Sequence, residues 1–216
     1  MANLTTDRKS IRKDGALFAY PVAAATVIYS GALVSINASG YAVPSADDAT
    51  LSFAGKSDLR ADNSAGANGD IAVEGNRTGV FEFAASGMAQ ADLNTDAYVV
   101  DDNTVGRGIV AQPSLVTGVT LKRVATSCGG SRSLAFTSAG ALLAYGGGTA
   151  VNVGAGGDFF LTASDGSQIL AKVVAASLPA LNQSDTIQLR HQRCGRITEI
   201  ASATSVFVDT AAATRN

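Results

Sequence analysis

Residues 20–44 constrain the fold of this chain more than any other segment. The segment is rich in β-branched and small residues, contains no charged group, is interrupted by Gly31 and Gly40, and is closed by Pro44. β-Branched residues favour the pleated, half-buried surface of a sheet, whereas glycine and proline mark the turns between strands. The segment therefore predicts short strands joined by tight turns, suited to packing and to main-chain pairing.

The composition extends this prediction to the whole chain. Its 216 residues include 23 glycines and no tryptophan, and charged residues make up 16%, against roughly 25% in an average soluble domain. A chain of this length can form one large all-β domain or two small ones. Because so few charges would have to be desolvated when neighbours cover the surface, the composition also favours an assembly of several subunits.

Local patterns divide the chain further. Residues 1–15 are polar and lack periodicity, which indicates an extended arm, and residues 210–216 are expected to be a tail. The Asp165-Gly166 turn gives the strongest hairpin signal. A helical turn is expected at 89–94 and a short helix or an irregular link at 175–182. Strands are predicted at 25–30, 32–37, 41–44, 51–54, 71–74, 79–84, 97–100, 116–124, 134–136, 141–145, 150–153, 159–163, 168–174, 186–189, 196–200 and 205–209.

The net charge of −2 hides a strong asymmetry. Residues 45–105 hold eleven acids and three bases, a net charge of −8, which leaves +6 for the remainder. Basic residues gather at 8–13 and at 190–196. The low net charge excludes a generally basic nucleic-acid binder. Two interpretations stay open for the asymmetry: solvated loops, or oppositely charged faces that orient subunits on a partner.

The chain is poor in groups that catalyse reactions or bind metals. Its single histidine, His191, precedes Cys194 by three residues, which supplies at most two metal ligands, and no acid stands nearby in the sequence to orient a catalytic pair. The adjacent pairs at 47–48 and 101–102 match no calcium loop and are interpreted as turns. The sequence therefore predicts that the protein is not an enzyme and has no cofactor and no metal.

Other features of the sequence argue against several binding functions. The glycine-rich residues 154–157 precede an acid and a strand, whereas a phosphate loop precedes a helix. The basic residues 190–196 contact an acidic neighbour or form a solvated strand face, and they contain no aromatic residue to stack a base, so no nucleic-acid binding is expected. No segment has the roughly 18 to 20 apolar residues of a membrane span. Cys128 and Cys194 are able to pair in principle, but nothing in the sequence brings them together.

A series of turn and strand signatures resembles a known family. Residues 12–15 read Arg-Lys-Asp-Gly, and residues 28–34 read Ile-Tyr-Ser-Gly-Ala-Leu-Val. Further matching segments are 20–25, 37–44, 53–55, 69–70, 79–81, 98–105, 195–200 and 206–209. In this order they resemble the small head-decoration, or cement, proteins of Mu-like and related tailed phages. The resemblance covers roughly residues 1–111 and 191–216, and each signature is weak when taken singly.

The resemblance implies a fold and a function. The expected fold is an all-β protein with an N-terminal arm (1–15), a compact β-barrel or sandwich (16–111 with 191–216) and an inserted β subdomain (112–190), since the family has only a short connection at this place. A composition shift after Pro113 and the Asp165-Gly166 hairpin support the insertion independently. The implied function is to stabilise the phage head from outside by bridging major capsid protein subunits, as a virion protein made in the host cytoplasm.

Strand addition by the N-terminal arm is the expected mode of contact. The residues expected to meet the capsid are Arg8, Lys9, Arg12, Lys13, Leu17 and Phe18. A homo-oligomer is expected, a trimer before a dimer, with no nucleic acid and no membrane as partner. Two other classes of function stay open: a tail or spike component that binds a host surface, and a hydrolase, which would need paired acids in one cleft.

Overall fold

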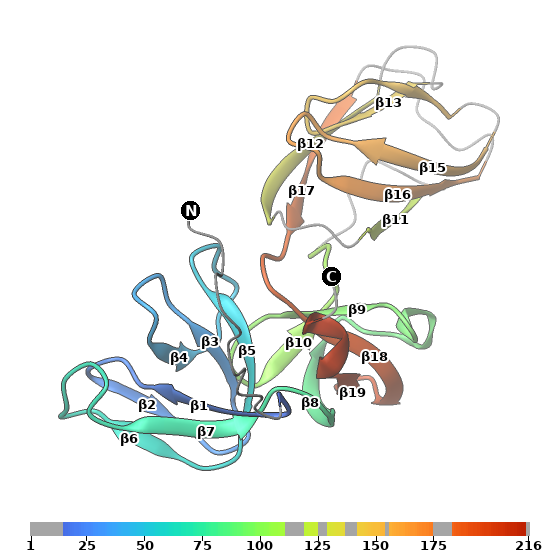
Figure 1. Cartoon of the computed structure of the whole chain (residues 1–216). Helices are drawn as coiled ribbons and strands as arrows, with labels where there is room; N and C mark the ends of the chain where they lie inside the picture. The colour runs from blue at the N-terminus through green and yellow to red at the C-terminus, as the bar shows by residue number, and fades with distance from the viewer. Residues whose placement is uncertain are drawn as a thin grey trace, which may run out of the picture.

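The computed structural model describes residues 15–110, 119–124, 129–136, 142–153, 156–174 and 183–214. Within these ranges the chain forms nineteen strands and two short 3-10 helices, so the predicted all-β class is confirmed. Figure 1 shows two parts: the strands β1–β10, β18 and β19 lie together, and the strands β11–β17 form a separate group beside them. We call the first part the body and the second the module.

The first half of the body is an antiparallel sheet that curls back on itself. Its strand order is β1-β7-β5-β3-β4, and an isolated parallel bridge from Val22 to Ala42 brings its two edges together. The strands are β1 (Leu17–Pro21), β3 (Leu33–Ile36), β4 (Ala42–Pro44), β5 (Ser52–Ser57) and β7 (Ala72–Asn76). A ribbon of β2 (Thr26–Ile28) and β6 (Ala61–Asn63) lies beside it. We call these seven strands the N-terminal sheet.

Glycine allows the close approach of two strands in the N-terminal sheet. A Cβ atom on Gly75 of β7 would lie 2.1 Å from the carbonyl oxygen of Lys56 on β5 and 2.7 Å from the ring of Phe18. No side chain fits at such distances, so only glycine permits this packing. The core beneath is built mainly of alanine and valine, with Phe18 and Ile28 as its large members.

The second half of the body is a closed five-stranded barrel. Its order is β10-β8-β19-β18-β9, with β8 and β10 parallel and the other pairs antiparallel. Leu33 and Phe53 of the N-terminal sheet pack into the barrel core, so the two halves share apolar contacts. The strands are β8 (Val80–Ser86), β9 (Asp96–Val99), β10 (Thr104–Gly106), β18 (Arg193–Ser202) and β19 (Ser205–Asp209).

The module consists of two sheets around its own core. One sheet has the order β11-β16-β15 and the other β14-β13-β12-β17. All members of the core except Ile109 come from residues 119–189. The strands are β11 (Val119–Arg123), β12 (Gly130–Phe136), β13 (Leu142–Tyr145), β14 (Val151–Asn152), β15 (Gly157–Thr162), β16 (Gln168–Val173) and β17 (Gln183–Leu189). The predicted Asp165-Gly166 hairpin is confirmed between β15 and β16.

The structure differs from the sequence prediction at both ends of the body. The expected tail is wrong for residues 210–214, which form a 3-10 helix, η2 (Thr210–Thr214). Thr210 is buried, and its N–H and hydroxyl both donate to the carbonyl of Gly79.

The helical turn expected at 89–94 is confirmed as η1 (Gln90–Asp92). The strands β1, β6 and β10 were not among the predicted ones.

Several predictions lie outside the described residues. They concern the arm over residues 1–14, the link at 175–182 and the partner proposed for Cys194, Cys128. Cys194 itself is a free thiol in the barrel core. Its burial raises the pKa of the thiol to about 12, so the group stays protonated and inert at neutral pH.

Candidate functional site

The predicted capsid contacts fall into two groups. Arg8, Lys9, Arg12 and Lys13 lie outside the described residues. Leu17 and Phe18 are both on β1 but face opposite ways, as neighbours on a strand do. Leu17 is 65% exposed, whereas Phe18 is buried in the core and its ring stacks on that of Tyr20 with centroids 5.0 Å apart. Of the two, only Leu17 has an exposed side chain.

The start of β1 is an edge of the N-terminal sheet. The N–H of Arg77 donates to the carbonyl of Ala16, and the N–H of Val22 donates to the carbonyl of Ile71. Because bonded pairs recur at every second residue of an antiparallel ladder, Leu17 and Ala19 direct their main-chain groups away from β7. Within the described part of the chain no other strand pairs with this side of β1. Pro21 has no N–H, so the pairing edge is short.

A second candidate site is the junction where the chain passes from the module back to the body. Residues 190–192 connect β17 to β18 there, and they contact Asp47 in the loop after β4. Asp47 Oδ1 accepts the N–H of His191 at 2.7 Å and lies 3.0 Å from His191 Nδ1, and Asp47 Oδ2 lies 3.7 Å from Arg190 Nη1. Of the two alternatives that the sequence leaves open for residues 190–196, the contact with an acidic group is found here within the same chain.

Gln192 binds the segment 190–192 to the N-terminal sheet through side-chain hydrogen bonds. Its Oε1 accepts a hydrogen bond from Ser35 Oγ at 2.7 Å, and its Nε2 donates to the carbonyl of Ala46. Ser35 Oγ is also 2.7 Å from Ser45 Oγ. All three side chains are buried, so these bonds replace the water that each group would otherwise bind. The junction is held on the body by a satisfied polar network.

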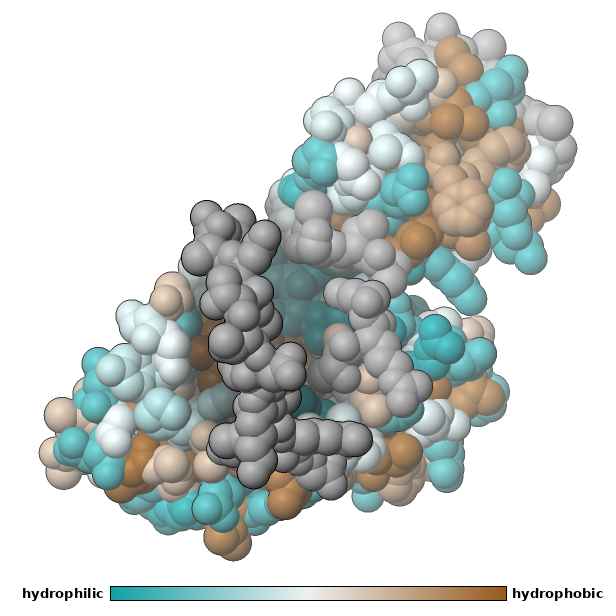
Figure 2. Space-filling view, in the orientation of Figure 1, coloured by the Kyte–Doolittle hydropathy of each residue, from teal (hydrophilic) through white to brown (hydrophobic). Residues whose placement is uncertain are grey.

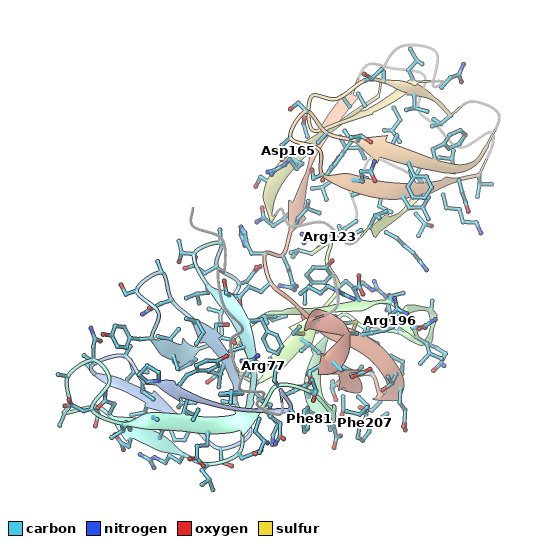
Figure 3. The ribbon with its side chains drawn as sticks, viewed as in Figure 1. Arg77, Phe81, Arg123, Asp165, Arg196 and Phe207 are labelled. Carbon is cyan, nitrogen blue, oxygen red and sulfur yellow. The ribbon has the colours of Figure 1, made fainter. Side chains whose placement is uncertain are left out.

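Other contacts hold the module side of the junction. Ile109 and Leu189 form an isolated antiparallel bridge, so the outgoing and returning chains lie next to each other. Arg123 on β11 donates to the carbonyl of Arg190 and places its guanidinium 4.5 Å from the centre of the Tyr98 ring. Figure 3 shows Arg123 between the module and the body. Burial lowers the pKa of Arg190, against the opposing effect of Asp47 and Asp101.

The module also presents an apolar face. Phe160 and Val174 are each 62% exposed. Phe160 pairs with Leu170 across β15 and β16, and Leu170 pairs with Lys122 across β16 and β11, so these three side chains form one row on the outward face of the sheet. Figure 2 shows apolar surface over this part of the module. Monomeric proteins expose such residues singly, whereas a contiguous group marks a contact surface when it is large enough.

The described residues contain no group of three or more His, Cys, Asp or Glu side chains that could hold a metal ion. His191 and Cys194 do not form a pair: His191 faces Asp47, and Cys194 is part of the barrel core. No helix in the described ranges is long and apolar enough to cross a membrane. The junction at residues 190–192 contains hydrogen-bonding and charged side chains.

Comparisons with protein-family models, with curated proteins and with solved structures find no match. Sequence reasoning did not single out Asp96 or Tyr98, both of which lie at the junction, and it interpreted Asp47 only as a turn residue. The one available signal was the opposite charge of residues 45–105 and 190–196, which the structure brings together at Asp47 and Asp96.

Proposed function

We propose that this chain is a structural, non-catalytic protein of a tailed-phage particle, which decorates the capsid and bridges neighbouring major capsid protein subunits from outside. The observation that carries the proposal is the edge of β1. This edge follows directly on residues 1–14 and leaves the main-chain groups of Leu17 and Ala19 without a strand partner among the described residues. A chain that enters such an edge is suited to pairing with a sheet of another protein.

The family signatures support this proposal because they belong to the body. Residues 28–34 cover the end of β2, a turn and the start of β3, and residues 37–44 cover the turn before β4 and β4 itself. Residues 206–209 lie within β19. The signatures thus coincide with the elements that build the N-terminal sheet and the barrel, while the module falls where the family has a short connection.

The proposed mechanism is adhesion of many copies. Each copy adds strand-like main-chain bonds from its N-terminal segment to a capsid subunit, and Arg8, Lys9, Arg12 and Lys13 meet carboxylates on the shell. Leu17, being exposed, adds an apolar contact, whereas Phe18 stays in the core. A homo-oligomer, a trimer first and a dimer second, multiplies these modest contacts because its second and third arms bind intramolecularly.

Co-sedimentation with capsid shells tests the proposal. The shells are assembled from the major capsid protein of the phage whose genome encodes this chain. Deletion of residues 1–14 is expected to abolish binding while circular dichroism and the melting temperature show an intact fold, since the described strands are all retained. Arg60→Ala is the matched control, because Arg60 is an exposed, basic residue near the ribbon. Full binding by the deletion variant would refute the arm mechanism.

A second candidate function is a tail or spike component that binds a host surface. The exposed side chains of Phe160 and Val174 on the module favour it, since they offer an apolar contact surface on a different part of the molecule from the β1 edge. Electron microscopy of particles labelled with an antibody against the module distinguishes the two proposals. Label over the head supports capsid decoration, and label confined to the tail supports host binding.

A further inference from the structure

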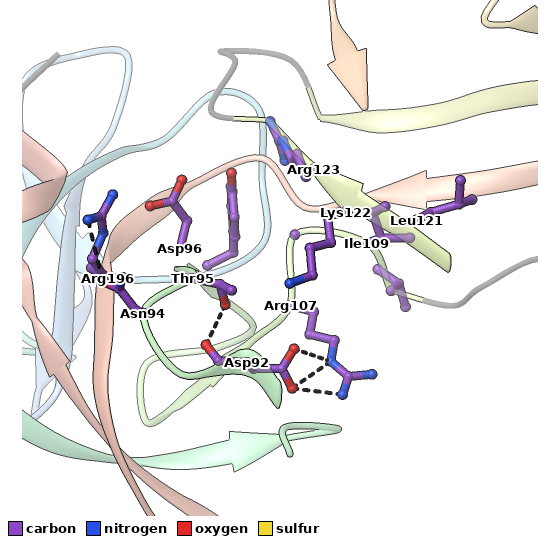
Figure 4. A pocket seen from close by; sticks show the side chains of 13 residues that line it. Asp92, Asn94, Thr95, Asp96, Arg107, Ile109, Leu121, Lys122, Arg123 and Arg196 are labelled. Carbon is purple, nitrogen blue, oxygen red and sulfur yellow. Dashed lines mark hydrogen bonds and ion pairs between the residues drawn. The ribbon is translucent and has the colours of Figure 1, made fainter. Parts of the chain in front are cut away.

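A cavity opens between the barrel and the module. Its volume is about 250 Å³, and its walls come from η1, β9, the chain after β10, β11 and β18. Figure 4 shows Lys122 reaching into it from β11, with Arg196 on β18 at the opposite side and the Asp92–Arg107 pair below.

The two carboxylates of the cavity are already neutralised. Asp92 accepts hydrogen bonds from Arg107, at 2.9 Å from Nε and 2.7 Å from Nη2. Asp96 accepts a hydrogen bond of 2.8 Å from Nη2 of Arg193. Each acid is thus held by one arginine; the Asp96–Arg193 pair is largely buried, whereas the Arg107 side chain is 45% exposed. These two acids do not cancel the charge of the other basic residues of the cavity.

Two cations remain without an acidic partner within the part of the chain that the structure describes. Lys122 takes part in none of the ion pairs found there, and Arg196 makes only a long contact, 3.5 Å, with the amide oxygen of Asn94. The two side chains stand on opposite walls (Figure 4). Each of them can donate a charge-assisted hydrogen bond to a carboxylate that enters the cavity.

The rest of the wall is apolar. Ile109, Val110 and Leu121 line it together with the ring of Tyr98. The volume lies just below the roughly 300–1,000 Å³ of pockets that hold whole drug-sized molecules. It therefore suits one or two side chains of a longer ligand, with an apolar group and an anionic group side by side.

We infer that this cavity binds an extended segment of a partner protein, which inserts an Asp or Glu carboxylate between Lys122 and Arg196 and an adjacent apolar side chain against Ile109 and Leu121. The segment is recognised by charge complementarity together with burial of one apolar group. The inference does not rest on the proposed capsid function, because it concerns a different surface from the β1 edge. Its test uses synthetic ligands and no phage component.

The test is a titration of the full-length protein with capped tetrapeptides, followed by calorimetry and by ¹H–¹⁵N NMR. The peptide Gly-Leu-Asp-Gly, acetylated and amidated so that its only charge is the Asp side chain, is compared with Gly-Leu-Asn-Gly. The Asp peptide is expected to bind about tenfold more tightly, and less so at high salt. Shifted amide signals are expected at Thr95, Val110 and Lys122.

Single substitutions locate the site. Lys122→Gln and Arg196→Gln are each expected to weaken binding of the Asp peptide about five- to tenfold, because each removes one charge-assisted hydrogen bond. Lys172→Gln is the matched control: Lys172 is an exposed lysine on the neighbouring strand of the same sheet and does not line the cavity. It is expected to leave the affinity unchanged.

Three results would overturn the inference. The first is equal binding of the Asp and Asn peptides. The second is full affinity in the Lys122→Gln and Arg196→Gln variants. The third is free succinate binding as tightly as the Asp peptide, which would show a small-anion site in place of a docking site for a protein segment.

Discussion

The N-terminal sheet and the module are both made of short antiparallel strands, yet their cores are built from different residues. The core of the N-terminal sheet has four alanines, and its closest strand contact runs through Gly75. The module core contains seven large side chains that are fully buried, namely Leu134, Leu143, Tyr145, Leu161, Ile169, Ile187 and Leu189. One core depends on the approach of backbones and the other on the interlocking of side chains.

Because of this difference, we expect the N-terminal sheet to be destabilised by added side-chain atoms and the module by shortened side chains. A core of small residues has little side-chain volume to lose but no space for an added atom, because neighbouring main chains already touch. A core of leucine and isoleucine loses much apolar area and leaves a cavity when a side chain is shortened.

The largest effect is expected from Gly75→Ala in the N-terminal sheet. The new Cβ atom would collide with the carbonyl of Lys56, and main chain cannot move aside without separating β5 from β7. We expect a loss of about 4 kcal/mol or more in the free energy of unfolding, measured by urea denaturation. Gly15→Ala is the control, since nothing lies within 4 Å of its Cβ position. A loss below about 1 kcal/mol for Gly75→Ala would contradict the backbone-contact interpretation.

Leu134→Ala in the module is expected to cost about 3 kcal/mol, because it removes a fully buried side chain and leaves a cavity. Native-state hydrogen exchange shows where the loss falls. Amides of β12, β13 and β17 should exchange faster, while those of β3 and β19 keep their protection. Equal acceleration in both parts would show that body and module unfold as one unit, against the division at residues 112–190.

Asp47→Asn at the junction is expected to cost about 1–2 kcal/mol, since it weakens the bonds to His191 and removes the charge facing Arg190. Limited trypsin digestion should then cleave faster at Arg190 and Arg193. The matched control is Asp48→Asn, because Asp48 is the adjacent acid and its carboxylate, within the described part of the chain, accepts hydrogen bonds only from Thr50 in its own turn. Unchanged cleavage in Asp47→Asn would show that other contacts hold the junction.

The smallest effect concerns the hairpin turn of the module. Hydrogen bonds from Ser167, with Arg132 nearby, lower the pKa of Asp165 to about 2, against about 3.9 in an unfolded chain. Because the unfolded chain binds this proton more readily, the contribution of Asp165 to stability is present above about pH 4 and is lost as the pH falls towards 2. A ¹³C carboxyl titration measures the pKa directly. Ser167→Ala should raise it, and an unchanged value would contradict the assigned cause.

Much of the fold could be predicted from the sequence because the signals were local. The alternation at 116–124, the Asp165-Gly166 turn and the β-branched run at 205–209 each lie within a few residues of the strands that they predict. The strand β1 was missed because Leu17 and Phe18 stand at the end of a charged segment and resemble its continuation. The helix η2 was missed because its anchor, the carbonyl of Gly79, is distant in the sequence.

The candidate sites were harder to predict for the same reason. Asp47 and His191 are 144 residues apart, and Tyr98 meets Arg123 only when the module lies on the barrel. Net charge along the sequence indicated that acidic and basic segments existed, but it could not show that they pair inside one molecule. The cavity depends wholly on the placement of β11 against β9, which no local pattern encodes.

The bridge between Ile109 and Leu189 has a consequence for how such a chain can change over generations. The chain leaves the body near Ile109 and returns to it near Leu189, and these two residues lie next to each other. The body therefore constrains the intervening residues chiefly by the position of their two ends. A shorter, longer or unrelated sequence with neighbouring ends would satisfy that demand equally well. Recombination at this place can therefore replace the module while leaving the body intact.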